Sequence, residues 1–424
     1  QDQRRDRQRG QRGQQGQQGQ EGQQGDQMGE LRENQQGLRD QLKRLMEELR
    51  KKGFGQASDM IKFAPKAQLT AIVDIQLDRL LGSQQLQSAL HGRPAHDEML
   101  FIIVHQAYEL WFKLILWELD AVLAAFRSSP VPEEEVGRAV LHCGRIVEIQ
   151  RVLIQQVDVL ETMTPLDFLD FRDTLIPASG IQSVQFRLIE NKLGMRRQDR
   201  LQVHAHYTSR FREEDAARVE ASEKEPSLFD LVEVWLERTP FLHFGDFDFW
   251  REYRRAVDTM LAADRASIRS NPTLTEDERA IQLAGVDATA RRFAEVFEPG
   301  ASEPVAPSGR HLSRRALQAA LLINLYRDEP ILHLPFRLLA LLTDIERNFT
   351  TWRQRHAQMA MRMIGTRIGT GGTSGHEYLD RAAESHKVFS DLSALASFFI
   401  PRSALPTLPP DVRSRMGFKF QSPR

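Results

Sequence analysis

Two histidines lie among apolar residues of predicted helices, where an imidazole either bonds a core partner or takes part in chemistry. Along the predicted helix that contains His356, large apolar side chains recur at spacings of three and four residues: Ile345, Phe349, Trp352, Met359 and Met363. One interpretation of His356 is a core histidine that bonds a backbone carbonyl. The other is an axial ligand of an iron porphyrin, because a neutral imidazole on an apolar wall suits that group.

A second imidazole, His105, follows the apolar run in LFIIVHQAYELWFK, and Phe101 lies four residues before it. Residues four apart are neighbours on one helical face, so these two rings are predicted to meet. In LDFLDFRDTLIPASG the same spacing pairs Phe168 with Arg172. A guanidinium beside several aspartates is usually part of a structural ion pair, and the alternative is bidentate capture of a substrate carboxylate.

A glycine-rich loop, GTGGTSG, follows the helix of His356 at residues 369–375. It lacks the Lys-Ser/Thr ending of a phosphate loop, which argues against nucleotide binding. Its glycines, beginning with Gly369, allow backbone N–H groups to approach a ligand closely, and Thr370 and Thr373 add hydroxyls. The alternative is a flexible linker, but strongly patterned helices on both sides favour a ligand.

Other site classes find little support in the motifs. No HExxH and no Cys/His quartet occurs, which argues against zinc chemistry. A serine hydrolase needs a strand-turn-helix elbow such as GxSxG, and the chain has none.

Helical periodicity dominates from about residue 68, and strand signals are scarce. We therefore predict one all-α domain over residues 68–415, with about 250–300 as a helical excursion. Local signals predict where several helices begin and end. One helix begins with an N-terminal cap at Thr164, with Pro165 and Asp167 in its first turn, and another runs from about Ile181 to Lys192 and ends at Gly194. A capping box of Thr275 with Glu278 begins a third, and a long helix runs from near Pro335 to Gly365.

The N-terminal region differs from the rest in composition. Residues 1–27 are almost entirely Gln, Gly and Arg, with glycine at every third position from Gly10 to Gly25. This is the collagen spacing, but without proline it predicts disorder rather than a triple helix. Residues 28–67 read as a charged helix and linker, either solvated or partner-binding, and residues 416–424 as a C-terminal tail.

The charge balance indicates which partners to expect, and the cysteine content indicates the cellular compartment. Lys plus Arg number 57 against 58 for Asp plus Glu, so nucleic acid and anionic membranes are not expected as partners. No stretch of about 18 uncharged apolar residues occurs, which argues against a membrane span. A single cysteine, Cys143, fits a reducing compartment, so we expect a cytoplasmic protein.

Three long segments carry a resemblance to a known family. HDEMLFIIVHQAYELWFK (96–113), FRDTLIPASGIQSVQFRLIENKLG (171–194) and WRQRHAQMAMRMIGTRIGTGGTSGHEYL (352–379) closely resemble the tryptophan 2,3-dioxygenases, and the similarity runs from about residue 69 to 408. The resemblance implies an all-helical enzyme with haem b, usually a homotetramer. It also implies addition of both atoms of O₂ across the indole C2=C3 bond of L-tryptophan, which gives N-formylkynurenine.

The resemblance also implies roles for single residues. By position these are His356 as axial haem ligand, His105 as acceptor of a hydrogen bond from the indole N–H, Phe101 as packing on the indole, Arg172 as partner of the substrate carboxylate, Thr370 as contact of the substrate ammonium and carboxylate, and Ser179 as lining of the distal pocket. We place Phe168 with the substrate, and Trp352 and Gly369 with the haem.

The sequence departs from the family at several positions. Ala71 and Asp74 stand where a Tyr-x-x-Tyr pair is usual, and a carboxylate in place of a phenol changes the shape and the charge of that wall. Thr174, Ala360 and Met361 also replace residues usual in the family. These departures keep a second hypothesis open, a haem monooxygenase of the same fold that acts on a substituted tryptophan or another aromatic amino acid. The long N-terminal tail keeps a third hypothesis open, in which the protein binds haem but catalyses no reaction.

Overall fold

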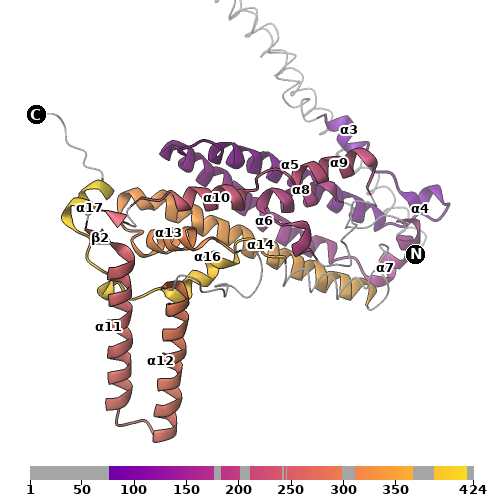
Figure 1. Ribbon diagram of the computed structural model, residues 1–424. Helices are drawn as coiled ribbons and strands as arrows, with labels where there is room; N and C mark the ends of the chain where they lie inside the picture. Colours follow the sequence, from indigo (N-terminus) through magenta and orange to yellow (C-terminus); the bar gives the residue numbers. More distant parts are fainter. Residues whose placement is uncertain are drawn as a thin grey trace, which may run out of the picture. The chain divides into compact units, whose positions relative to one another are not determined.

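The computed structural model describes residues 76–175, 183–200, 211–240, 243–244, 246–297, 311–365 and 386–417 (Figure 1). The chain divides into two compact units, Gln1–Gln85 and Leu86–Arg424. In the first unit the described residues contain one short helix, α3 (Leu77–Leu81). Several sequence predictions fall outside the described residues: the tail 1–27, the segment 28–67, Ala71, Asp74, Ser179, Gly369, Thr370 and residues 418–424.

Three long helices position most of the candidate residues: α5 (Glu98–Phe126), α6 (Glu133–Leu160) and α14 (His333–Ile364). α6 packs against both α5 and α14. In α5 the buried residues Ile115, Leu119 and Val122 follow the helical spacing of three and four. Matching stripes on the other two helices close a core of leucine, isoleucine, valine and phenylalanine. The predicted all-α class is confirmed.

Shorter helices complete the second unit. They are α4 (Gln87–Leu90), α7 (Pro165–Arg172), η1 (Asp173–Leu175), α8 (Val184–Leu193), η3 (Arg197–Asp199), α9 (Glu213–Ser222), α10 (Leu228–Glu237), α11 (Phe249–Ser270), α12 (Glu276–Phe297), α13 (Arg314–Leu325), η6 (Pro330–Leu332), α16 (Ser390–Ala394), η7 (Leu395–Phe398), η8 (Arg402–Ala404) and α17 (Pro410–Met416). The strands described are β1 (His243–Phe244) and β2 (Phe247–Asp248), an antiparallel pair. α11 and α12 pack side by side in the stretch predicted as a helical excursion (Figure 1).

The helix ends follow their local signals closely. Thr164 accepts from the Asp167 N–H and Asp167 accepts from the Thr164 N–H, so a complete capping box opens α7. α8 ends at Gly194, whose φ of 134° suits glycine. Thr275 and Glu278 exchange the predicted bonds before α12. Two starts differ: α8 begins at Val184 rather than about Ile181, and α14 begins at His333 rather than near Pro335.

α5 is apolar enough, by length and composition, to cross a membrane, and it is the one such helix among those described. Its inner face is buried against α6, with Leu119 and Val122 fully inaccessible. Glu118 on the same helix is also buried and is bonded to side chains of α6. A central helix of a helical bundle has this composition as well.

Candidate functional site

On α5, one hydrogen bond sets the protonation pattern of His105. Its Nδ1 lies 2.7 Å from the carbonyl oxygen of Phe101, one turn earlier on the same helix. A carbonyl can only accept, so Nδ1 carries the proton and donates, and Nε2 keeps its lone pair in the neutral ring. The rings of Phe101 and His105 lie 4.0 Å apart between centroids, as the four-residue spacing predicts.

The surroundings of His105 favour the neutral form. Burial among protein atoms lowers the pKa of its imidazole, although the hydrogen bond to Phe101 and the charge of Glu109 act in the opposite direction. The side chain nevertheless keeps exposed surface. The imidazole therefore remains accessible to a small molecule, as a substrate hydrogen bond requires.

α14 supplies the second imidazole, His356, which stacks on Trp352 with 5.7 Å between ring centroids. Burial, the larger cause, and a positive charge on His105 together lower the pKa of His356 to about 4. No hydrogen bond contributes to this shift, so the alternative of a core histidine bonded to a carbonyl gains no support among the described residues.

Aromatic rings surround Trp352. Its ring centroid lies 5.1 Å from that of Phe186 on α8, 5.9 Å from Phe112 and 6.0 Å from Tyr108, both on α5. The Tyr108 hydroxyl donates to the carbonyl of Leu153 on α6 at 2.9 Å, which fixes the ring between the helices. This wall is apolar and rigid, as a planar aromatic ligand requires.

α7 brings further predicted residues to the same region. The Phe101 ring lies 5.9 Å from Phe168 and 5.6 Å from Phe171, so α7 packs its aromatic face against α5 beside His105. Arg172 stands in the last turn of α7 and is half-buried. The structure thus gathers the described candidates around α5, α7 and α14.

The residues present fit an iron porphyrin. Among the described residues no group of three or more His, Cys, Asp or Glu side chains could hold a metal ion. A neutral imidazole such as His356 beside stacked aromatic rings is a suitable single protein ligand.

Sequence reasoning missed a polar cluster centred on Glu190 of α8, which meets this aromatic wall at Phe186. Its carboxylate accepts from Arg187 at 2.7 Å, from Arg353 of α14 at 3.0 Å and from Arg200. The Nδ1 atom of His386 lies 3.6 Å away. Burial would raise the pKa of Glu190, but the neighbouring guanidiniums outweigh it and hold that pKa well below its usual range.

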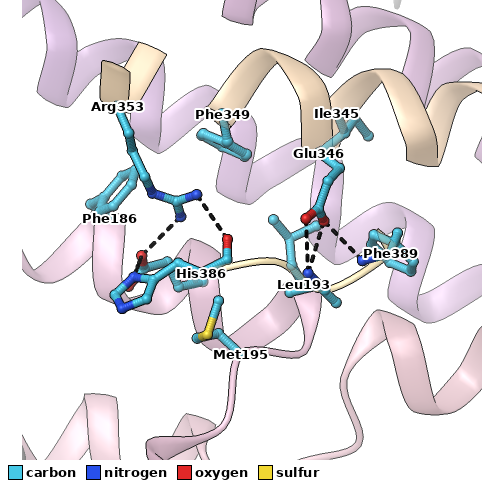
Figure 2. A pocket seen from close by; sticks show the side chains of 11 residues that line it. Phe186, Leu193, Met195, Ile345, Glu346, Phe349, Arg353, His386 and Phe389 are labelled. Carbon is cyan, nitrogen blue, oxygen red and sulfur yellow. Dashed lines mark hydrogen bonds and ion pairs between the residues drawn. The ribbon is translucent and has the colours of Figure 1, made fainter. Parts of the chain in front are cut away.

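The chain that leaves α14 at Gly365 returns to the same helix at His386. Arg353 donates to the His386 carbonyl at 3.1 Å. Glu346, seven residues earlier on α14, accepts from the backbone N–H groups of Val388 and Phe389, at 2.9 Å and 2.8 Å (Figure 2). The charged pair in the apolar helix QFRLIENKL was the available signal for this cluster, but its partners on α14 lie far away in sequence.

Comparison with known proteins identifies the relatives of this arrangement. The sequence model of the family described as tryptophan 2,3-dioxygenase matches residues 69–399. A tryptophan 2,3-dioxygenase of Bdellovibrio bacteriovorus is 51% identical over 81% of this chain and 96% of its own length. Namesakes from Dictyostelium discoideum and Anopheles gambiae are 46% and 42% identical, each over 82% of this chain and over 87% and 90% of their own lengths.

Proposed function

The chain belongs to the tryptophan 2,3-dioxygenase family, and from this premise we propose that it adds both atoms of O₂ across the indole C2=C3 bond of L-tryptophan, giving N-formylkynurenine. The observation that carries the proposal is the placement of His105 on α5 and His356 on α14 among linked aromatic rings: Phe101 packs on His105, Trp352 stacks on His356, and Tyr108 and Phe112 of α5 contact Trp352.

We propose haem b as the cofactor, with His356 as its axial ligand. The neutral state of the His356 ring supports this, because a protonated imidazole has no lone pair for iron. Trp352 would pack beside the ligand, and Gly369, outside the described residues, would allow close backbone approach. When bound, haem would supply the activation of O₂, which no protein side chain provides.

The protein's own contribution is to hold the substrate. The Nε2 atom of His105 would accept the hydrogen bond from the indole N–H, since Nδ1 already donates to Phe101. His105 acts here as an acceptor and need not remove a proton. Phe101 and Phe168 would pack on the indole ring. Positioning of this kind can supply a large share of a rate enhancement.

The charged end of the amino acid needs its own contacts. Arg172 would pair with the carboxylate, because a guanidinium binds a carboxylate through two parallel hydrogen bonds. Thr370 would contact the ammonium and the carboxylate, and Ser179 would line the distal side. Both of these residues lie outside the described part of the chain.

We further propose a cytoplasmic homotetramer. Ile103, Leu110 and Trp117 recur every seven residues on α5 with 49%, 52% and 74% of their surfaces exposed. An apolar stripe of this kind on a helix indicates a surface that another subunit covers. The single cysteine, Cys143, is buried and its thiol pKa is raised to about 12, which supports a structural role in a reducing compartment.

The proposal is tested with purified, haem-loaded and reduced protein, L-tryptophan and O₂. We expect kynurenine-type absorbance after hydrolysis of the formamide, over many turnovers. A protein that binds haem but forms no such product would contradict the proposed reaction.

A further inference from the structure

We propose that Glu190 and Arg353 are positioning residues for the candidate axial ligand: their buried ion pair fixes Trp352 and, through its ring, the orientation of His356. The inference deepens the proposed function and rests on haem binding at His356. Neither residue would touch the substrate or the iron.

Arg353 lies at the centre of the contacts that carry this inference. One guanidinium nitrogen donates to Glu190 at 3.0 Å, and the other donates to the His386 carbonyl at 3.1 Å. The guanidinium carbon also lies 5.8 Å from the ring centroid of Phe186 and 5.9 Å from that of Phe349 (Figure 2). Two directed hydrogen bonds and two ring contacts leave this planar group one favourable position.

From Arg353 the contacts continue to the imidazole through aromatic rings. The Phe186 ring beneath the guanidinium packs on Trp352 at 5.1 Å, and Trp352 stacks on His356 at 5.7 Å. Residues three and four apart lie on the same side of a helix, so 352, 353 and 356 move together when α14 rotates. The rotation that brings Arg353 to Glu190 therefore also places Trp352 between Phe186 and His356.

Glu190 is itself held independently of Arg353. Arg187, one turn away on α8, donates to it at 2.7 Å, and Arg200 donates to it from beyond the end of that helix. Glu190 is 3% exposed, so its carboxylate has little contact with water. Replacing Arg353 would leave the carboxylate paired, whereas replacing Glu190 would leave three buried guanidiniums around a neutral group. Arg353 is therefore the sharper position to change.

The space beside Arg353 gives its neighbours room to shift if the contact is lost. A cavity of about 20 Å³ lies there, lined by Phe186, Glu346, Phe349, Arg353 and His386 among others (Figure 2). A site for one water molecule needs about 10–15 Å³. A shorter side chain at position 353 would enlarge this space, and the ring of Phe186 could then move away from Trp352.

The test compares Arg353→Met, Arg353→Lys and Glu190→Gln with a matched control, Glu118→Gln. Glu118 is a buried carboxylate that also bonds basic side chains, His142 at 2.6 Å and Arg145 at 2.7 Å, and both of these partners lie on α6. Two measurements are made on each haem-loaded protein: the resonance Raman band of the ferrous iron–histidine bond, and the rate of haem transfer to excess apomyoglobin.

We expect Arg353→Met to shift or broaden the iron–histidine band and to speed haem loss by about tenfold or more. Arg353→Lys should recover part of both effects, since lysine keeps the charge but not the planar contacts. Glu118→Gln should lower the melting temperature while leaving both signals as in the wild type.

An Arg353→Met protein with the wild-type band and the wild-type rate of haem loss would overturn the inference. If that variant does not fold, Arg353→Lys decides the question by the same two measurements. A wild-type protein that shows no iron–histidine band would overturn the proposed haem site itself. Equal bands in the wild type and the variants would instead overturn only the positioning role of Glu190 and Arg353.

Discussion

At the scale of single residues, one backbone hydrogen bond determines which nitrogen of His105 can accept a hydrogen bond from a substrate. The spacing of Phe101 and His105 predicted that the rings meet, and they do. The tautomer could not be predicted from sequence, since it depends on where the ring points relative to a carbonyl oxygen.

The pH dependence of turnover follows from this assignment. Burial lowers the pKa of His105 from its usual value of 6.5, so the neutral form predominates above pH 6.5 and the protonated form gains only on further acidification. We expect kcat/KM for L-tryptophan to stay level from about pH 8 down to about pH 6.5 and then to fall at more acidic pH. His105→Gln, which keeps an acceptor that does not titrate, should lose this acid limb. An equal acid limb in the variant would assign it to another group.

The role of Arg172 predicts a change in substrate affinity. A hydrogen bond to a charged group contributes about 1.5–3 kcal/mol, so Arg172→Met should raise KM for L-tryptophan by about ten- to a hundred-fold. Arg151→Met is the control, because Arg151 forms a surface pair with Glu148 at 2.5 Å on α6. Steady-state kinetics on both variants decide, and an unchanged KM in Arg172→Met would exclude the carboxylate contact.

At the scale of elements, helix ends could be predicted well because their signals are local. Thr164 with Asp167, and Thr275 with Glu278, form their capping boxes within three residues of sequence. The Glu190 cluster could not be predicted, because Arg353 and His386 come from positions 163 and 196 residues further along the chain, and only packing of α8 on α14 brings them together.

A substitution at Gly194 tests how closely the C-terminal end of α8 is packed against its neighbours. Its φ of 134° disfavours any side chain, and a Cβ there would lie 2.7 Å from the Cβ of Phe229 and 3.0 Å from the Cγ1 of Val388. Gly194→Ala should therefore lower the free energy of unfolding by about 1–3 kcal/mol. Gly144→Ala in α6, where a Cβ meets nothing within 4 Å, should be neutral or stabilising. Urea unfolding measures both, and equal midpoints would contradict the account of α8.

At the scale of the whole molecule, the all-α class could be predicted because helical periodicity dominates the sequence from about residue 68 onward. The sequence could not predict which helices pair, since apolar stripes on α5, α6 and α14 are alike in composition and only their packing distinguishes them. In that packing Tyr108 and Phe112 of α5 meet Trp352 of α14, with α6 in contact with both helices.

The exposed stripe on α5 predicts how the molecule assembles. Trp117→Glu places a charge in the proposed interface, and we expect light scattering to show species smaller than a tetramer. Ile281→Glu on α12, where the side chain is 72% exposed against 74% for Trp117, should leave the mass unchanged. A tetramer that persists in Trp117→Glu would place the interface elsewhere.

The most direct test of the central claim is the fate of the two oxygen atoms. Reduced, haem-loaded protein is incubated with L-tryptophan and ¹⁸O₂, and the product masses are read by mass spectrometry. The account predicts N-formylkynurenine in which both oxygen atoms of one O₂ molecule are incorporated. A product that carries one labelled oxygen atom would contradict it and favour a monooxygenase of the same fold.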